Sequence, residues 1–187
     1  MKAFSALMAG SVLALCSCGS KQPADPKPAQ AQEQKQETAQ QPQQEEKKQH
    51  ELTIAEVQPY FERAEKINAI DTAFYEVLDA KGNKIGTVLL SSPYSDDVKG
   101  FNGPTPLLIA MDADGYIKDV VLLENEETPK FAKIVADGGL YQAWDGLTSE
   151  EALDKEVDAV SGATYTSNGV KNSLKARLQA YQKQLKK

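Results

Sequence analysis

The alternation of apolar and polar residues predicts two β-hairpins in the second half of the chain. Residues 73–78 and 85–90 are rich in β-branched and aromatic side chains, and they flank a polar segment of turn-forming residues. Residues 106–111 and 116–123 form a second such pair around an Asp-Ala-Asp-Gly turn. Because helical patterns surround both hairpins, we expect an α+β fold in which a mainly antiparallel sheet packs against helices.

Helices are predicted on both sides of these hairpins. Thr53 and Glu56 have the spacing of a capping box and predict a helix over residues 53–68, which Pro59 kinks or shortens. Apolar residues at helical spacing predict a last helix over residues 167–185. Two shorter helices are expected over residues 129–136 and 149–153. The residues expected on the buried side of the last helix are Val170, Leu174, Leu178, Tyr181 and Leu185.

The start of the chain is typical of an export signal. A basic first turn precedes an apolar run over residues 3–15, which is too short to span a bilayer. Leu15, Ser17 and Cys18 resemble the lipobox of bacterial lipoproteins, which implies a signal peptide over residues 1–18 and a lipid on Cys18. Gly19, in place of aspartate, favours an extracytoplasmic protein anchored to the outer membrane or at the periplasmic face. An ordinary secretory signal is the alternative.

A low-complexity segment separates this signal from the rest of the chain. Residues 19–50 contain ten glutamines and four prolines but no large apolar side chain. Such a segment buries too little apolar area to offset the entropy of ordering, so we expect a disordered tether. Residues 51–187 are then a single domain, long enough to build one core.

Composition argues against several classes of function. Cys16 and Cys18 are the only cysteines, so the expected domain has no disulfide, iron–sulfur cluster or thiolate zinc site. His50 is the only histidine and lies in the tether, which argues against histidine catalysis and axial haem ligation. The net charge of −6 gives no support for nucleic-acid binding. Six basic residues over 171–187 predict either a docking surface for an acidic partner or a solvated helix face.

Residues 158–167 carry the candidate chemistry. The segment is a loop of small and hydroxylated residues that leads into the last predicted helix. Gly162 and Ala163 leave room for a bulky group near the backbone, and free N–H groups at a helix start favour a phosphate. Thr164, Thr166 and Ser167 add hydroxyls. The alternative is a plain cap, with Thr166 or Ser167 as the N-cap residue.

The same segment resembles the flavinylation motif of FMN-binding domains. These domains occur in sodium-translocating NADH:quinone reductases and in Rnf-type electron-transport complexes, as part of one subunit of each. The resemblance implies FMN joined through its phosphate, as a phosphoester, to Thr164, by a flavin transferase that uses FAD and a divalent metal outside the cytoplasm. It also implies that Asp158 assists this transfer. The residues that carry the resemblance are Asp158, Ser161, Gly162, Ala163 and Thr164.

Three further segments extend the resemblance across the domain. Residues 100–104 resemble a glycine-rich family segment, and residues 144–146 also have a family counterpart. Glu127 and Thr128, before Pro129, resemble the Glu-Thr-Pro element near the flavin ring, so both are expected to contact FMN. The family continues with Gly-Leu-Gly, whereas this chain has Lys-Phe-Ala at 130–132. The candidate ring neighbours, which are otherwise core residues, are Phe101, Phe131, Tyr141 and Trp144.

These observations predict an extracytoplasmic electron carrier. No haem attachment pattern, Rossmann fingerprint or metal cluster accompanies the flavin motif, and the domain lacks a histidine base. We therefore expect an electron carrier that exchanges electrons with membrane donors or acceptors, in preference to an enzyme that acts alone. The alternatives are a non-redox envelope lipoprotein that acts as a scaffold or binding module, and a small flavin-dependent reductase.

Overall fold

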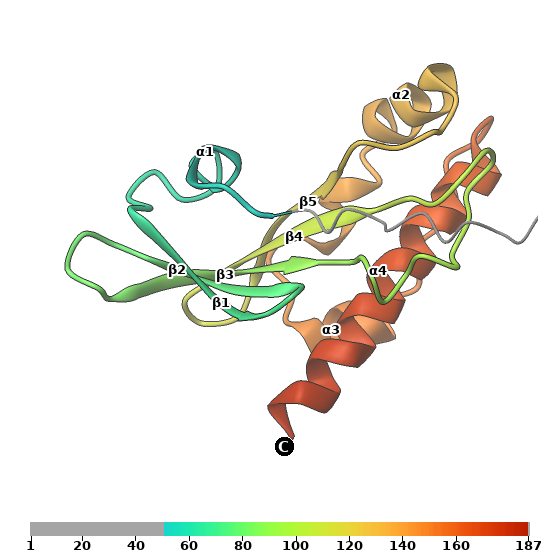
Figure 1. Ribbon diagram of the computed structural model, residues 1–187. Helices are drawn as coiled ribbons and strands as arrows, with labels where there is room; N and C mark the ends of the chain where they lie inside the picture. Colours follow the sequence, from blue (N-terminus) through green and yellow to red (C-terminus); the bar gives the residue numbers. More distant parts are fainter. Residues whose placement is uncertain (1–50, 187) are drawn as a thin grey trace, which may run out of the picture. The chain divides into compact units, whose positions relative to one another are not determined.

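The structure is a computed structural model that describes residues 51–186 (Figure 1). The predicted signal peptide over residues 1–18, the lipidated Cys18 and the tether over residues 19–50 lie outside the described residues and stay predictions.

Five antiparallel strands form one sheet in the order β1-β2-β3-β4-β5, so each strand pairs with its neighbour in sequence. Helices pack against this sheet, which confirms the α+β class with an antiparallel sheet built of hairpins. The two predicted hairpins are β2–β3 and β4–β5. The strands are β1 (Lys66–Asp71), β2 (Phe74–Leu78), β3 (Lys84–Leu90), β4 (Leu107–Asp112) and β5 (Ile117–Leu122).

The helices occupy the positions predicted from the sequence, with three exceptions. The first helix is short, the last helix begins three residues earlier than predicted, and a 3₁₀ turn, η1, was not predicted. The elements are α1 (Ile54–Val57), α2 (Pro129–Asp137), η1 (Tyr141–Trp144), α3 (Ser149–Asp154) and α4 (Thr164–Leu185).

The central strands β3 and β4 are buried on both faces of the sheet. Side chains alternate across a strand, and in β4 the odd-numbered residues Leu107, Ile109 and Met111 join one core cluster. Leu108 and Ala110 join a second cluster on the opposite face. Side chains from α2, η1, α3 and α4 complete the first cluster, and residues 52–64 complete the second. The continuous apolar run of β4 therefore reflects a strand between two cores.

The predicted helix over residues 53–68 is wrong beyond its first turn. α1 ends at Val57, and Pro59 follows two residues later. Proline cannot donate its i→i−4 hydrogen bond and its ring clashes with the carbonyl four residues earlier, so the helix does not continue. Residues 66–71 instead form β1, which pairs with β2. Phe61 and Ala64 are still buried, but from a turn and not from a helix face.

The long helix α4 lies across the first core cluster. Val170, Leu174, Leu178 and Tyr181 are buried as predicted, whereas Leu185 is 57% exposed because the last turn extends past the core. Within residues 51–186, no helix is both long enough and apolar enough to cross a membrane.

Arg177 of α4 does not belong to a solvated basic face. It is fully buried, donates to the carbonyl of Ala73 at 3.0 Å and lies 4.7 Å from the ring centre of Tyr94. Burial lowers the pKa of its guanidinium, and nearby acidic groups oppose that shift. Arg177 therefore joins α4 to the β1–β2 turn, and the basic surface of this helix consists of its lysines.

Candidate functional site

Thr164 is the first residue of α4 and is exposed. Within the described residues its hydroxyl has no hydrogen-bond partner. The helix start lies beside the loop between β3 and β4 and near α2 (Figure 1). A free hydroxyl on a surface helix terminus is open to a second protein, which a buried or bonded hydroxyl would not be.

The N-cap residue of α4 is Ala163, which corrects the expectation that Thr166 or Ser167 caps the helix. Both hydroxyls have other partners. Thr166 donates to the carboxylate of Glu127, and Ser167 accepts from the backbone N–H of Val160 at 3.1 Å. Because no side chain caps α4, the N–H groups of its first turn remain available to an anion.

The loop before α4 exposes the remaining motif residues except Ala163. Ser161 and Gly162 are exposed, and Gly162 has φ +85°, a left-handed conformation that favours glycine. Ala163 is buried at the edge of the first core cluster. Asp158 is exposed six residues before Thr164, so its carboxylate is accessible from solvent.

Three aromatic rings meet next to Thr164. Phe101 contacts Phe131 edge-on, with ring centres 5.0 Å apart, and its ring centre lies 6.3 Å from that of Tyr165. Phe101 is 55% exposed and Tyr165 is 70% exposed, which is unusual for side chains of this size. We call Phe101, Phe131 and Tyr165 the aromatic surface. Sequence reasoning did not single out Tyr165, although its place inside the motif was a usable signal.

Glu127 is buried beneath this surface, with 5% of the residue exposed. Its Oε1 accepts hydrogen bonds from the backbone N–H groups of Asn102 at 2.8 Å and Gly103 at 3.2 Å, and its Oε2 accepts from Thr166. Burial by itself would raise the pKa of Glu127. The hydrogen bonds outweigh burial and hold the pKa of this carboxyl below its ordinary value of 4.5.

The other residues that were expected near the flavin divide into two groups. Thr128 is half-buried and is the N-cap residue of α2, where its carbonyl accepts from the N–H of Phe131 at 2.8 Å. Tyr141 and Trp144 lie in the first core cluster and face away from solvent. Burial raises the pKa of Tyr141 to about 12, so its hydroxyl stays neutral. Of the four candidate ring neighbours, only Phe101 and Phe131 therefore lie in the aromatic surface with Tyr165.

Comparison with known proteins shows which family the segment around Thr164 resembles. Residues 100–179, which include Thr164, Glu127 and the aromatic surface, match the family model of the FMN-binding domain. Residues 100–179 are therefore similar to an FMN-binding domain. It is also 26% identical, over 113 residues, to a subunit of the Na⁺-translocating ferredoxin:NAD⁺ oxidoreductase complex of Acetobacterium woodii. That alignment covers 55% of this chain and 52% of the relative, so the chain spans about half the length of the relative it matches.

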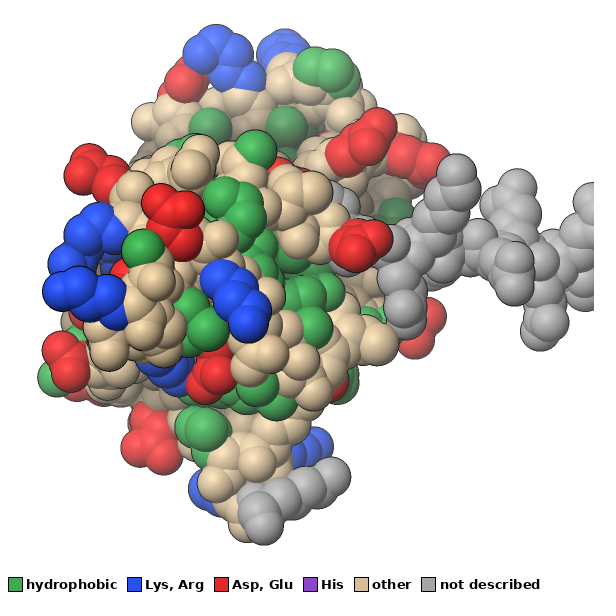
Figure 2. All heavy atoms as spheres, turned by 60° about the vertical axis from the view of Figure 1, so that its left-hand side comes forward, with side chains coloured by type: hydrophobic (Ala, Val, Ile, Leu, Met, Phe, Trp, Pro, Cys, Tyr) green, Lys and Arg blue, Asp and Glu red, His purple; other side chains and the backbone are tan. Residues whose placement is uncertain are grey.

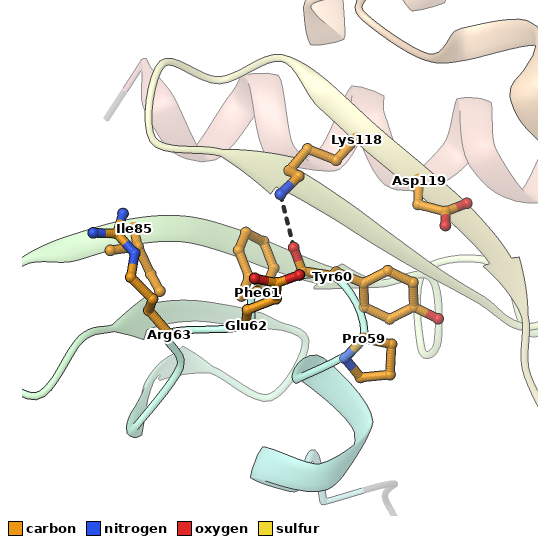
Figure 3. A pocket seen from close by; sticks show the side chains of 8 residues that line it. All are labelled: Pro59, Tyr60, Phe61, Glu62, Arg63, Ile85, Lys118 and Asp119. Carbon is orange, nitrogen blue, oxygen red and sulfur yellow. Dashed lines mark hydrogen bonds between the residues drawn. The ribbon is translucent and has the colours of Figure 1, made fainter.

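The described part of the chain also has a hollow of about 480 Å³, lined by residues 59–63, Ile85, Lys118 and Asp119 (Figure 3). The Lys118 ammonium donates to the carbonyl of Tyr60 at 2.7 Å and lies 5.0 Å from the ring centre of Phe61, so its charge is already engaged. Apolar side chains lie among charged ones on the side that carries α1 (Figure 2). Within residues 51–186 no group of three or more metal-ligating side chains is placed to hold a metal ion.

The lowered pKa of Glu127 predicts that the folded protein loses stability at acid pH. The folded carboxyl binds protons more weakly than the unfolded one, so its stabilising effect is complete above about pH 4.5. The effect declines as the pH falls through the lowered pKa. We expect the free energy of urea unfolding to drop less between pH 6 and pH 3 in Glu127→Gln than in the natural protein. Equal drops in the two proteins would contradict this assignment.

Proposed function

We propose that this protein is an extracytoplasmic electron carrier whose FMN is bound covalently, through its phosphate, to Thr164. The observation that carries the proposal is the exposed and unbonded hydroxyl of Thr164, at the uncapped start of α4 inside an FMN-binding domain. The relative in Acetobacterium woodii is named as part of a ferredoxin:NAD⁺ oxidoreductase complex, which supports a role in electron transfer.

The residues present fit FMN. Free N–H groups in the first turn of α4 suit a phosphate, and the helix dipole adds about 0.3–1 kcal/mol for each negative charge. Exposed Phe101 and Tyr165 offer apolar faces to an isoalloxazine ring, and aromatic contacts of this kind add about 0.5–1.5 kcal/mol. Phe131, which stands where the family has leucine, supports the ring of Phe101 from α2.

Attachment follows from the chemistry of a phosphoester. The Thr164 oxygen attacks the flavin-side phosphorus of FAD, the bond from this phosphorus to AMP breaks, and AMP leaves. The hydroxyl proton passes to a base, and the exposed Asp158 carboxylate assists on the side of this chain. A flavin transferase with a divalent metal supplies the rest of the site. An exposed loop of small residues admits such an enzyme, whereas a deep pocket would not.

A covalently bound flavin suits a protein that moves electrons outside the cytoplasm. Flavin carries one or two electrons, while the protein supplies position and electrostatics. A lipid on Cys18 and the tether that the sequence predicts over residues 19–50 would let the FMN-binding domain reach membrane redox partners.

The direct test is an intact mass of the exported protein, produced with and without an active flavin transferase. We expect a gain of one FMN less one water only with the transferase, mapped by fragmentation to the peptide that contains Thr164. The transferase must be shown to modify a second target in the same cells. An unmodified mass under that condition would contradict covalent attachment. Residues 161–164 would then be a loop that only leads into α4.

A further inference from the structure

Glu127 joins two segments that lie far apart in sequence. Its carboxylate accepts from the backbone of Asn102 and Gly103 in the β3–β4 loop and from Thr166 in the first turn of α4. Thr166 is fully buried, and Glu127 is nearly so. Both oxygens of the carboxylate are therefore occupied by protein donors. With only 5% of the residue exposed, Glu127 presents little surface to a flavin ring.

The two segments are also in direct backbone contact. A Cβ atom added at Gly169 would lie 2.6 Å from the Cα of Gly100, closer than real side chains approach. One turn further along α4, the hydroxyl of Ser173 lies 3.0 Å from that of Thr105, and both residues are fully buried. The β3–β4 loop is thus fixed on α4 by glycine packing, by a hydroxyl pair and by the Glu127 carboxylate.

We call these three contacts between the β3–β4 loop and α4 the joint. The joint determines the surroundings of Thr164. Phe101 precedes Asn102, and Tyr165 precedes Thr166, so the two exposed rings are the immediate neighbours of the residues that Glu127 holds. The joint also keeps the hydroxyl of Thr166 from competing with that of Thr164 for the flavin phosphate. Thr166 is buried and hydrogen-bonded, whereas Thr164, two residues earlier, is exposed.

We propose that Glu127 is a positioning residue for flavin attachment: through Thr166 and the N–H groups of Asn102 and Gly103, it holds Thr164 and the aromatic surface in the geometry that the transferase recognises. The proposal rests on the proposed function. It differs from the expectation that Glu127 contacts FMN, since a positioning residue governs the rate of attachment and leaves the electronic properties of the attached flavin unchanged.

The test measures the rate of flavin attachment to the purified full chain, with purified transferase, FAD and a divalent cation. Thr166→Val keeps the shape of the side chain but removes the donor, and Glu127→Ala removes the acceptor. Thr148→Val is the matched control, because Thr148 also donates to a glutamate, Glu151, at 2.9 Å but lies in the N-cap of α3. All rates are measured below the unfolding transition of every variant.

We expect kcat/KM for attachment to fall about tenfold or more in Thr166→Val and Glu127→Ala, because a small misplacement of a reacting group is costly. Thr148→Val should attach FMN at the natural rate, and Glu127→Gln, which keeps one oxygen acceptor, should recover part of the loss. In the flavin-free protein, hydrogen exchange at the Asn102 and Gly103 amides should be faster in Glu127→Ala. The flavin that does attach should keep its natural absorption spectrum and reduction potential.

Two results would overturn the positioning role and leave the proposed function standing. Natural attachment rates in both Thr166→Val and Glu127→Ala would show that the joint does not matter. A natural rate with an altered flavin potential in Glu127→Gln would show that Glu127 contacts the ring itself. If the natural protein takes no FMN from an active transferase, the proposed function fails and the positioning role fails with it.

Discussion

Replacing Thr164 by alanine is expected to abolish covalent attachment of FMN. The substitution removes the exposed hydroxyl at the start of α4, and the neighbouring hydroxyls of Thr166 and Ser167 are buried and hydrogen-bonded. Alanine is compatible with a first-turn helix position, so the fold should be unaffected. Intact mass after co-production with the transferase should show the unmodified chain, and the denatured protein should be colourless.

Two variants make this result specific. Thr164→Ser keeps the hydroxyl without the methyl group and should still accept FMN. Thr72→Ala removes an exposed threonine from the β1–β2 turn and should be loaded like the natural protein. Covalent FMN in Thr164→Ala, at the natural level, would place the attachment on another residue and refute the assignment.

Replacing Gly169 by alanine is expected to destabilise the protein even though alanine favours helices. The new Cβ would lie 2.6 Å from the Cα and 2.8 Å from the N of Gly100, and backbone atoms cannot move aside as a flexible side chain can. Overpacking of this kind costs about 1–3 kcal/mol, which exceeds or cancels the gain of about 1 kcal/mol in helix propensity. Urea unfolding should show the loss, and flavin attachment should slow because the β3–β4 loop is displaced.

Asn172→Ala supplies the reference for helix propensity, because Asn172 is exposed on the same helix. It should be as stable as the natural protein or slightly more so. If Gly169→Ala matched Asn172→Ala in unfolding free energy, the close approach of α4 to the β3–β4 loop would not constrain the fold.

Much of the fold follows from local patterns along the chain. The runs that became β3 and β4 are short, apolar and next to polar turns, which together favour buried strands paired in hairpins. The α+β class followed from those hairpins and from the helical spacing of Val170, Leu174 and Leu178. These features depend on neighbours a few residues apart, so the sequence contains them.

The errors lie where tertiary contacts override local pattern. Strand β1 has four exposed residues among its six and gains its structure from pairing with β2. Its sequence therefore contains no alternating apolar pattern from which a strand could be predicted. The start of α4 was misplaced because Thr166 and Ser167 look like caps, although their hydroxyls bond elsewhere. The partner of Thr166 is 39 residues away, a pairing that helix and strand periodicity cannot indicate.

The motif residues could be recognised from the sequence, but the different role of each residue could not. The family resemblance assigns Thr164 and Glu127 to one flavin site, and the hydroxyl of Thr166 makes it a candidate for the same site. The structure brings them together and gives them different environments, with Thr164 in solvent and the other two in the interior. Only burial and hydrogen-bond partners separate an acceptor from the residues that support it.

Burial of β3 and β4 on both faces of the sheet has a consequence for how the protein matures. The two core clusters are complete without Ser161, Gly162 or Thr164, which all remain at the surface. The described part of the chain can therefore complete both of its cores without a flavin. The attachment that we propose at Thr164 would then take place on a chain that has already folded.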